Sequence, residues 1–566
     1  MAKTTLMFSI CMLTALALLL AACQPLVSPS EMALAEQASE MSPEQAAPTI
    51  LVKGAPFHGA NGINFGPDGN LYIASVSGDE IIVMDPETGE LLERYGSDRN
   101  VMVPDDLAFA ADGSLFFTSL LTGQVGRISP QGEVEYIAEL TTGVNPITFS
   151  DDGRLFVAQC FMGDKLYELD PEGVDEPRLI SDQLGPGCGL NGMDWGSDGY
   201  LYGPRWFNGE VVRVDVDSGE FTTVADGFGV PAAVKFDSQG RLHVLDTMTG
   251  EVIRVDMASG AKDVLATLAP GLDNLAFDAE DNLYVSSFTD ATIEEVLDDG
   301  TTRVVSQGGM TSPGGIAIAQ MADGDSVFVA DFFGLREFDA ATGEQIGLEP
   351  TVLGVSEMYM PTTVAVDDQH LLLTSWPDNV VWIWDPEAGM LLEDYKNVAM
   401  PLNAIRFQGD LIVAELGTGS LVRLDGATEA DRTILADGLA MPIGLAAQGG
   451  SLWVSDAGMG QVLQVAADGQ MLPEPVLVVG GLMGPEGLAI AGDGSLLVVE
   501  AGAGRLTRID LDTGETRLVA DELALGHVSP TAVPTAFFNG VAVGQDGTIV
   551  VTGDIANIVY RIENAY

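Results

Sequence analysis

Short apolar runs alternate with turn residues in a regular rhythm from residue 49 onward. An apolar pair, an Asp-Gly turn and a second apolar run recur, as in GINFGPDGNLYIAS from Gly62, LAFAADGSLFFTS from Leu107 and GLAIAGDGSLLVVE from Gly487. The second run begins at Leu71, Leu115, Leu155, Leu201, Leu242, Leu283, Val327, Leu371, Leu411, Leu452, Leu496 and Ile549. A mean spacing of about 43 residues is typical of a protein built from repeated small sheets.

Each repeat contains four strand-like runs, with a turn such as Thr88-Gly89-Glu90 between the third and the fourth. Four strands in a repeat of this length predict one blade of a β-propeller. Because propellers usually have about four to eight blades, we expect an all-β protein of two tandem six-bladed propellers. The predicted domains are residues 48–299 and 300–566.

The ends of the repeat region suggest how each ring closes. The last repeat stops at a third strand (NIVYRIE), whereas residues 49–54 (TILVKG) resemble a fourth strand and precede the first repeat. We therefore expect residues 49–54 to close the first propeller beside the third strand of repeat six. Residues 301–307 (TTRVVSQ) are expected to close the second propeller in the same way, leaving no exposed sheet edge.

The repeat pattern resembles the six-bladed propellers of the NHL-repeat and SMP-30/gluconolactonase-like superfamily over residues 49–566. Strand direction alternates within a blade, so the loop entering the first strand and the loop leaving the second share one face, here called the upper face. The resemblance implies that ligands and metals lie at the upper end of the central channel. It indicates the fold more strongly than the function, because many activities use this fold.

Oxygen-bearing residues recur at the start of the first strand in the first propeller, where their side chains should point towards one axis. Converging amide and carboxylate oxygens suit a hard cation, Ca²⁺ or another divalent ion. The alternative is local: Asn and Asp also cap turns by binding nearby backbone groups. The predicted metal ligands are Asn61, Asp105, Asn145, Asn191 and Asp273; the sixth position is Ala232.

The same position in the second propeller carries fewer donors, and we expect Asn403, Glu486 and Asn539 to contribute to a ligand site there. Lactonases of the superfamily hold their metal with a Glu, an Asn and an Asp from these strand starts. The first ring here has no Glu and the second has no Asp at the position. This departure from the family pattern counts against lactonase activity.

Aromatic and basic residues in the upper loops of the first propeller are the other ligand-binding candidates: Phe161, Arg205, Trp206 and Phe288. Aromatic rings beside a lone Arg suit an anionic or carbohydrate-like ligand, whereas packing between loops is the alternative. The second strands of the second propeller end in four carboxylates, which either bind cations or tie neighbouring loops together. These are Asp331, Glu415, Asp456 and Glu500.

The N-terminus has the features of an export signal. An apolar run from Leu6 to Leu20 follows Lys3, and it is short for a membrane span. Leu20-Ala21-Ala22-Cys23 resembles the bacterial lipobox, which implies a signal peptide over 1–22, lipidation of Cys23 and a flexible tether over 23–47. A cleaved signal with a coincidental Cys is the alternative. Gln24, in place of an inner-membrane retention Asp, implies the periplasmic side of the outer membrane or the cell surface.

Export changes how the cysteines are interpreted. Cys160 and Cys188 should both lie on the upper face of adjacent blades. In an oxidising compartment they are expected to form a disulfide, with two free thiols as the alternative.

Charge narrows the choice of partners. The 566 residues include 83 acidic and 24 basic residues, giving a formal charge of −59. Nucleic acid is excluded, because binding it requires basic clusters. We expect the membrane to be contacted only through the N-terminal lipid.

Three functions follow. The first is a lipid-anchored protein whose upper faces bind a small molecule or protein partner, and the second is a metal-dependent lactonase-like hydrolase. A lyase similar to the streptogramin-inactivating propellers is the third, but it would need paired His and Glu on the upper face.

Overall fold

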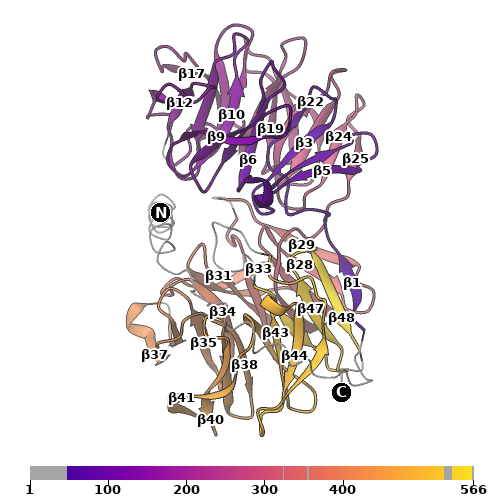
Figure 1. The fold of residues 1–566 in the computed structure, drawn as a ribbon, viewed down its shortest axis with the longest axis vertical. Coiled ribbons are helices and arrows are strands. Elements are labelled where there is room, and N and C mark those ends of the chain that lie inside the picture. The colour runs from indigo at the N-terminus through magenta and orange to yellow at the C-terminus, as the bar shows by residue number, and fades with distance from the viewer. Residues whose placement is uncertain are drawn as a thin grey trace.

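The protein is described here from a computed structural model covering residues 47–563, except 186, 323, 354–355, 427 and 528–537. Nearly all regular structure in these residues is β, arranged as twelve four-stranded antiparallel sheets (Figure 1). Four short 3-10 helices complete the described elements: η2 (Ser97–Arg99), η3 (Trp206–Asn208), η4 (Glu429–Asp431) and η5 (Ala501–Ala503). The all-β prediction is therefore confirmed.

We call residues 54–306 the first half of the molecule. Its six sheets are β2–β5 (Ile63–Phe65, Leu71–Ser75, Glu80–Met84, Leu91–Tyr95), β6–β9 (Pro104–Phe109, Leu115–Ser119, Gln124–Ile128, Val134–Glu139), β10–β13 (Val144–Phe149, Leu155–Gln159, Leu166–Leu169, Arg178–Ser181), β14–β17 (Asp194–Trp195, Leu201–Arg205, Glu210–Val214, Phe221–Asp226), β18–β21 (Pro231–Phe236, Leu242–Asp246, Glu251–Val255, Lys262–Thr267) and β22–β25 (Leu272–Phe277, Leu283–Ser287, Ile293–Val296, Thr302–Ser306).

The second half comprises β1 (Thr49–Lys53) and residues 307–563. Its sheets are β26–β29 (Pro313–Met321, Gly324–Asp331, Gly334–Asp339, Gln345–Pro350), β30–β33 (Thr363–Asp367, His370–Ser375, Val380–Asp385, Met390–Tyr395), β34–β37 (Pro401–Phe407, Asp410–Glu415, Ser420–Leu424, Arg432–Ala436), β38–β41 (Pro442–Gln448, Ser451–Asp456, Gln461–Ala467, Gln470–Gly480), β42–β45 (Pro485–Ile490, Leu496–Glu500, Arg505–Ile509, Thr516–Ala520) and β46–β48 (Val541–Val543, Ile549–Gly553, Ile558–Ile562) with β1.

The spacing of the repeats predicts where most second strands begin. Eight of the twelve second strands begin at the residue expected from the sequence, and β27, β31, β35 and β39 begin slightly earlier. The middle strands are buried on both faces: every residue of β4 is buried, whereas the fourth strand β5 has no buried residue. Burial on both faces explains why the middle strands read as continuous apolar runs rather than alternating ones.

The hydrophobic core is divided among the spaces between neighbouring sheets. One cluster combines Tyr202 and Val211 of one sheet with Val234, Leu242 and Val244 of the next. First strands also contact each other in succession within each half, and β2 contacts β22 while β26 contacts β46. The space surrounded by the first strands of the first half is called the first axis below, and its counterpart the second axis.

Closure differs from the sequence prediction. β1 pairs with β48 of the last repeat, with Thr49 opposite Arg561 and Lys53 opposite Ile558, and β25 pairs with β24 in the sheet of repeat six. Residues 49–54 therefore do not close the first half, and residues 301–307 do not close the second; the expected assignment was wrong. A boundary between residues 299 and 300 would separate β25 from the sheet to which it is hydrogen-bonded.

The physical reason is local connection. β24 and β25 are joined by a tight turn in which Leu297 accepts a hydrogen bond from the Gly300 N–H (2.9 Å). A hairpin of this length forms at little entropic cost, so β25 takes the edge of β24 first. The edge of β48 has no strand following it among the described residues, and β1 completes that sheet.

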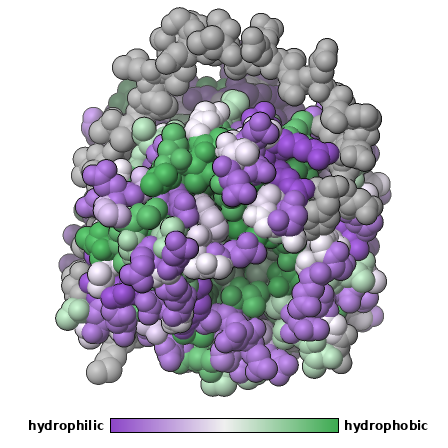
Figure 2. Space-filling model, turned by 90° about the horizontal axis from the view of Figure 1, so that it is seen from below, coloured by the Kyte–Doolittle hydropathy of each residue, from purple (hydrophilic) through white to green (hydrophobic). Residues whose placement is uncertain are grey.

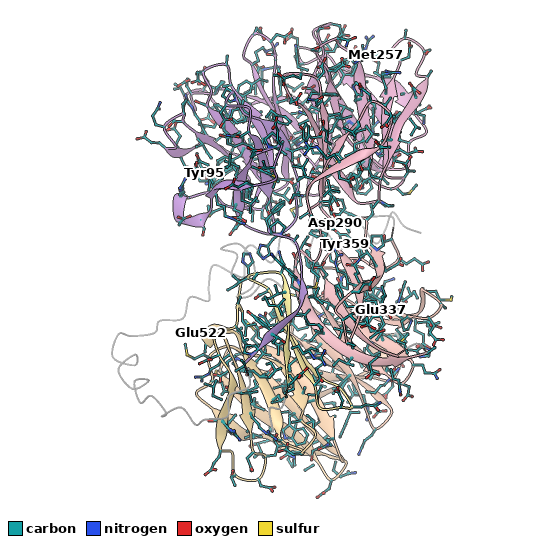
Figure 3. All side chains as sticks on the ribbon, turned by 90° about the vertical axis from the view of Figure 1, so that its right-hand side faces the viewer. Tyr95, Met257, Asp290, Glu337, Tyr359 and Glu522 are labelled. Carbon is teal, nitrogen blue, oxygen red and sulfur yellow. A yellow bond between two sulfur atoms is a disulfide. The ribbon has the colours of Figure 1, made fainter. Side chains whose placement is uncertain are left out.

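The upper faces of the two halves contact each other. His58 Nε2 donates to the Asp554 carbonyl (2.7 Å), Trp206 Nε1 to the Leu353 carbonyl (3.2 Å) and Arg336 to the Thr289 carbonyl (3.0 Å). Figure 3 places the labelled Asp290 and Tyr359 at the same junction. Loops on the upper face of one half thus face those of the other.

Candidate functional site

The structure brings the predicted metal ligands of the first half to the start of their first strands. Asp105 lies on β6, Asn145 on β10 and Asp273 on β22, whereas Asn61 and Asn191 lie just before β2 and β14. Asp105, Asn145 and Asn191 are buried, and Asn61 and Asp273 are partly exposed. The set therefore sits at the upper end of the first axis.

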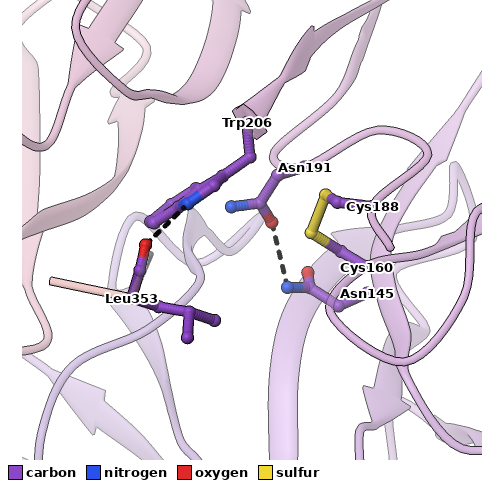
Figure 4. The surroundings of a disulfide bond; sticks show 6 residues. All are labelled: Asn145, Cys160, Cys188, Asn191, Trp206 and Leu353. Carbon is purple, nitrogen blue, oxygen red and sulfur yellow. Dashed lines mark hydrogen bonds between the residues drawn. A yellow bond between two sulfur atoms is a disulfide. The ribbon is translucent and has the colours of Figure 1, made fainter. Parts of the chain in front are cut away.

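All three amides of this set already have partners. Asn145 Nδ2 donates to Asn191 Oδ1 (3.0 Å; Figure 4). Asn61 Oδ1 accepts the N–H of Val76 (3.2 Å), as expected if this residue caps a turn. These bonds fix the side-chain orientations, and each amide oxygen retains a further lone pair.

The carboxylates of this set strongly influence each other. Burial, followed by repulsion from Asp273 and Asp106, raises the pKa of Asp105 well above its usual range. Burial and the charge of Asp106 raise the pKa of Asp273 to about 7, although a hydrogen bond from Asn61 lowers it. Asp105 Oδ2 is buried without a hydrogen-bond partner.

Sequence reasoning missed the layer beneath this set. Asp106 accepts hydrogen bonds from the Ile147 N–H (3.1 Å) and from Asn274 Nδ2 (3.1 Å). Burial raises the pKa of Asp106, and Lys235 lowers it. The signal was present in the sequence, because Asp106 and Asn274 directly follow Asp105 and Asp273.

A hard divalent cation fits the donor chemistry at the first axis. Two carboxylates and three amides supply oxygen, and the unpartnered Asp105 Oδ2 would gain a partner on cation binding. Within the described ranges there is no group of three or more His, Cys, Asp or Glu side chains placed to hold a metal. Any cation here would therefore depend on the amide oxygens as well.

The second axis has a different character. Glu486 and Asn539 are buried, and Glu486 Oε2 accepts both the N–H (2.6 Å) and Nδ2 (3.0 Å) of Asn539. Asn403 borders a cavity of about 190 Å³ whose other walls include Ile405, Ile443 and Leu445. Figure 2, which views the second half from the side turned away from the first half, shows hydrophobic residues around a central hollow.

The ring of carboxylates at the second-strand ends holds loops in place. Asp456 accepts the N–H groups of Ala440 (3.0 Å) and Met441 (2.9 Å). Asp331, Glu415 and Glu500 likewise accept backbone N–H groups of the loop entering their own sheet, and each also pairs with an Arg. These partners support the structural alternative rather than cation binding.

The aromatic candidates of the first half lie in contacts near the junction. Phe161 packs edge-on against Trp206 (5.1 Å between ring centres), and Phe288 packs against Phe333 of the second half (5.3 Å). Arg205 pairs with Glu210 (2.6 Å). Ligand binding by these four residues stays a prediction, because their described contacts are with protein groups.

The predicted disulfide is confirmed: Cys160 and Cys188 are joined, 28 residues apart in sequence (Figure 4). Cys188 lies in the loop entering β14, three residues before Asn191. The bond therefore fixes the loop that carries one predicted ligand.

Two histidines with no sequence relation meet at the junction. His58 of the first half and His527 of the second stack with ring centres 4.4 Å apart. Burial, followed by the charge of His527, lowers the pKa of His58 to about 3. His58 is therefore neutral in the folded protein at physiological pH.

The predicted signal peptide, Cys23 and most of the tether lie outside the described residues. Among the residues that the structure does describe, none of the helices has the length and apolar character needed to span a bilayer.

Comparisons with known proteins give one weak relative by sequence. The chain is 26% identical over 144 residues to the gluconolactonase of Zymomonas mobilis subsp. mobilis, a match covering 22% of this chain and 40% of the relative. It spans well under two thirds of that relative, and no protein-family model matches. The expected resemblance to gluconolactonase-like propellers is confirmed at this coarse level.

Solved structures give distant matches. A streptogramin B lyase aligns with a TM-score of 0.37 at 18% identity, covering 50% of this chain and 95% of that one. The extracellular domain of a one-component system from B. thetaiotaomicron aligns with a TM-score of 0.31 at 10% identity, covering 92% of this chain and 79% of that one.

Proposed function

We propose that the protein is an exported, lipid-anchored pair of six-bladed propellers whose first axis binds a divalent cation and, with it, a ligand. The observation that carries this proposal is the pair Asp105 and Asp273, held at one axis with raised pKa values and an unpartnered buried oxygen. A bound cation would offset their mutual repulsion.

The two-propeller arrangement is supported by contacts between the first and last sheets of each half. Ser286 Oγ donates to the Asn61 carbonyl (2.7 Å), and Thr552 Oγ1 donates to the Gly314 carbonyl (2.7 Å). Each bond joins sheets that are separated along the chain by the other sheets of that half. The lipobox-like Leu20-Ala21-Ala22-Cys23 supports export and anchoring.

A metal-dependent hydrolase acting on lactones is the second candidate, favoured by the match to a gluconolactonase. A cation at the first axis would supply Lewis-acid chemistry to a carbonyl. Asp273, whose pKa is about 7, can accept or donate a proton at neutral pH.

Calorimetric titration of the full chain with Ca²⁺, followed by lactone hydrolysis assays before and after chelation, tests both candidates. We expect Asn191→Ala to weaken Ca²⁺ binding at least about tenfold, a change of about 1.4 kcal/mol. Asn403→Ala, at the matching position of the second axis, should leave binding unchanged. Absence of bound metal would overturn the cation proposal, and turnover insensitive to chelation would overturn the hydrolase candidate.

A further inference from the structure

Four of the six upper loops of three sheets in the second half contain no charged residue. They read LGTG (416–419), AGMG (457–460), GLMG (481–484) and AGAG (501–504), whereas the loops entering β34 and β38 carry Lys396 and Asp437. In a chain with 83 acidic residues, four neighbouring upper loops without charge mark this face as chemically distinct from the rest of the surface.

Backbone hydrogen bonds join neighbouring upper loops of these sheets. The N–H of Leu416 donates to the Met400 carbonyl (3.0 Å), that of Ala457 to Met441 (2.9 Å) and that of Gly502 to Met483 (3.0 Å). The loops approach so closely that a Cβ on Gly458 would lie 2.8 Å from the Ala440 Cβ. The carboxylates below these loops are held by backbone, Arg and Thr groups, including the hydroxyl of Thr418 in the first of the loops.

Trp376, Met400, Leu416 and Met441 pack in one cluster at the mouth of the second axis, and Met459 and Met483 lie in neighbouring upper loops. Buried Leu402, Ile443 and Phe538 make its floor. Met459 is 62% exposed and Met483 is 53% exposed, although both are apolar. We call the following residues the methionine surface: Trp376, Met400, Leu416, Met441, Met459 and Met483.

One polar atom in this surface points to the chemistry of an occupant. The indole Nε1 of Trp376 is buried and has no hydrogen-bond partner. An N–H group withdrawn from water without an acceptor is costly, so a ligand acceptor placed against it would recover that energy.

We propose that the methionine surface binds a neutral apolar molecule that carries a hydrogen-bond acceptor. A charged ligand would lose hydration without finding a countercharge in the four uncharged loops, and an anion would also be repelled by the formal charge of −59. Methionine side chains adapt to ligands of different shape, which suits a surface that recognises apolar character. This site is separate from the first axis and does not depend on a cation.

Photolabelling of the full chain with a diazirine-bearing dodecyl methyl ketone tests the proposal. Peptide mapping should find label on Met400, Met441, Met459 and Met483, and unlabelled 2-dodecanone should compete. Dodecanoate should compete at least about tenfold less well. Met459→Glu and Met483→Glu alter exposed side chains, so both variants should fold, and each should lower labelling at least about fivefold.

Met257→Glu is the matched control, because Met257 is 42% exposed and lies at the far end of the first half (Figure 3). It should leave labelling unchanged. Trp376→Phe should lower labelling by the ketone about fivefold but spare a diazirine alkane of equal length. Label spread evenly over exposed methionines, or insensitivity to the Glu variants, would overturn the site. If Trp376→Phe lowers labelling by both probes equally, the ligand's hydrogen-bond acceptor does not bind the Trp376 indole.

Discussion

The two axes of this protein are built from the same repeated sheet but end in opposite chemistry. At the first axis, Asp105 and Asp273 meet three amides and repel each other. At the second, Glu486 is already paired with Asn539, and Ile443 and Phe538 make an apolar floor. Backbone pairing holds the sheets in both halves, so the residues at the axis are free to differ without changing the fold.

The halves also differ in how their last sheet is completed. β25 follows β24 through a tight turn, whereas β1 reaches β48 from the other end of the described chain. Similar strand sequences thus occupy equivalent positions through local contact in one half and remote contact in the other.

The largest expected effect comes from a substitution in each of the two closing strands, β1 and β25. Val52 of β1 and Val305 of β25 are both buried, the first among residues of the second half and the second among residues of the first. Replacing either with Asp buries an unpaired charge and should cost about 3 kcal/mol or more. Hydrogen exchange should rise only in the second half for Val52→Asp and only in the first for Val305→Asp. Faster exchange in β22–β24 of Val52→Asp would contradict the observed pairing.

The disulfide is expected to matter to one half only. Replacing Cys160 and Cys188 with Ala removes a link that constrains the unfolded chain, and should cost about 3 kcal/mol. Thermal unfolding should show the loss in the transition of the first half. Reductant should lower the melting temperature of the native chain and leave that of the variant unchanged; equal responses would refute this assignment.

Acid should weaken the junction between the halves. The pKa of His58 is lowered to about 3 in the fold, against 6.5 in the unfolded chain. The neutral form is the folded one, so stability is complete above pH 6.5 and falls as the pH drops towards 3. The loss at about pH 5 should be about 2 kcal/mol. The free energy of unfolding, measured by denaturant at pH 7 and at pH 5, gives this loss, and the difference between the two pH values should be smaller in His58→Gln. If the variant shows the same difference as the native chain, groups other than His58 cause it.

The smallest expected effect tests the charge at the first axis. The pKa of Asp273 is raised to about 7, so its charged form is penalised as the pH rises above 3.8, and the penalty is complete above about 7. Asp273 is partly exposed, so Asp273→Asn should stabilise the cation-free protein at pH 8 by only about 1 kcal/mol. It should also abolish any rise in melting temperature with Ca²⁺. A Ca²⁺ response equal to that of the native chain would remove Asp273 from the site.

Periodicity was sufficient to predict the sheets, because a middle strand buried on both faces requires an uninterrupted apolar run such as Leu-Tyr-Ile-Ala at Leu71. It was not sufficient to assign β1, since Thr49–Lys53 and Thr302–Ser306 are both acceptable fourth strands and only connection decides between them.

Only part of the candidate site was predicted, because the rest depends on contacts between sheets that are distant in sequence. Asp105 and Asp273 follow the repeat and could be found by alignment of the repeats within the chain. Asp106 gains its role from Asn274 and Lys235, which belong to other sheets. The meeting of His58 with His527 depends on how two halves dock, and no spacing along the chain encodes that.

The pairing of β1 with β48 has a consequence for the order of synthesis. β1 is made before any other described strand, and its partner is made last. During translation, residues 49–53 therefore stay without their partner strand while eleven sheets are made. A chain interrupted before β48 keeps both an unpaired strand and an open sheet edge, which leaves incomplete products available to proteases.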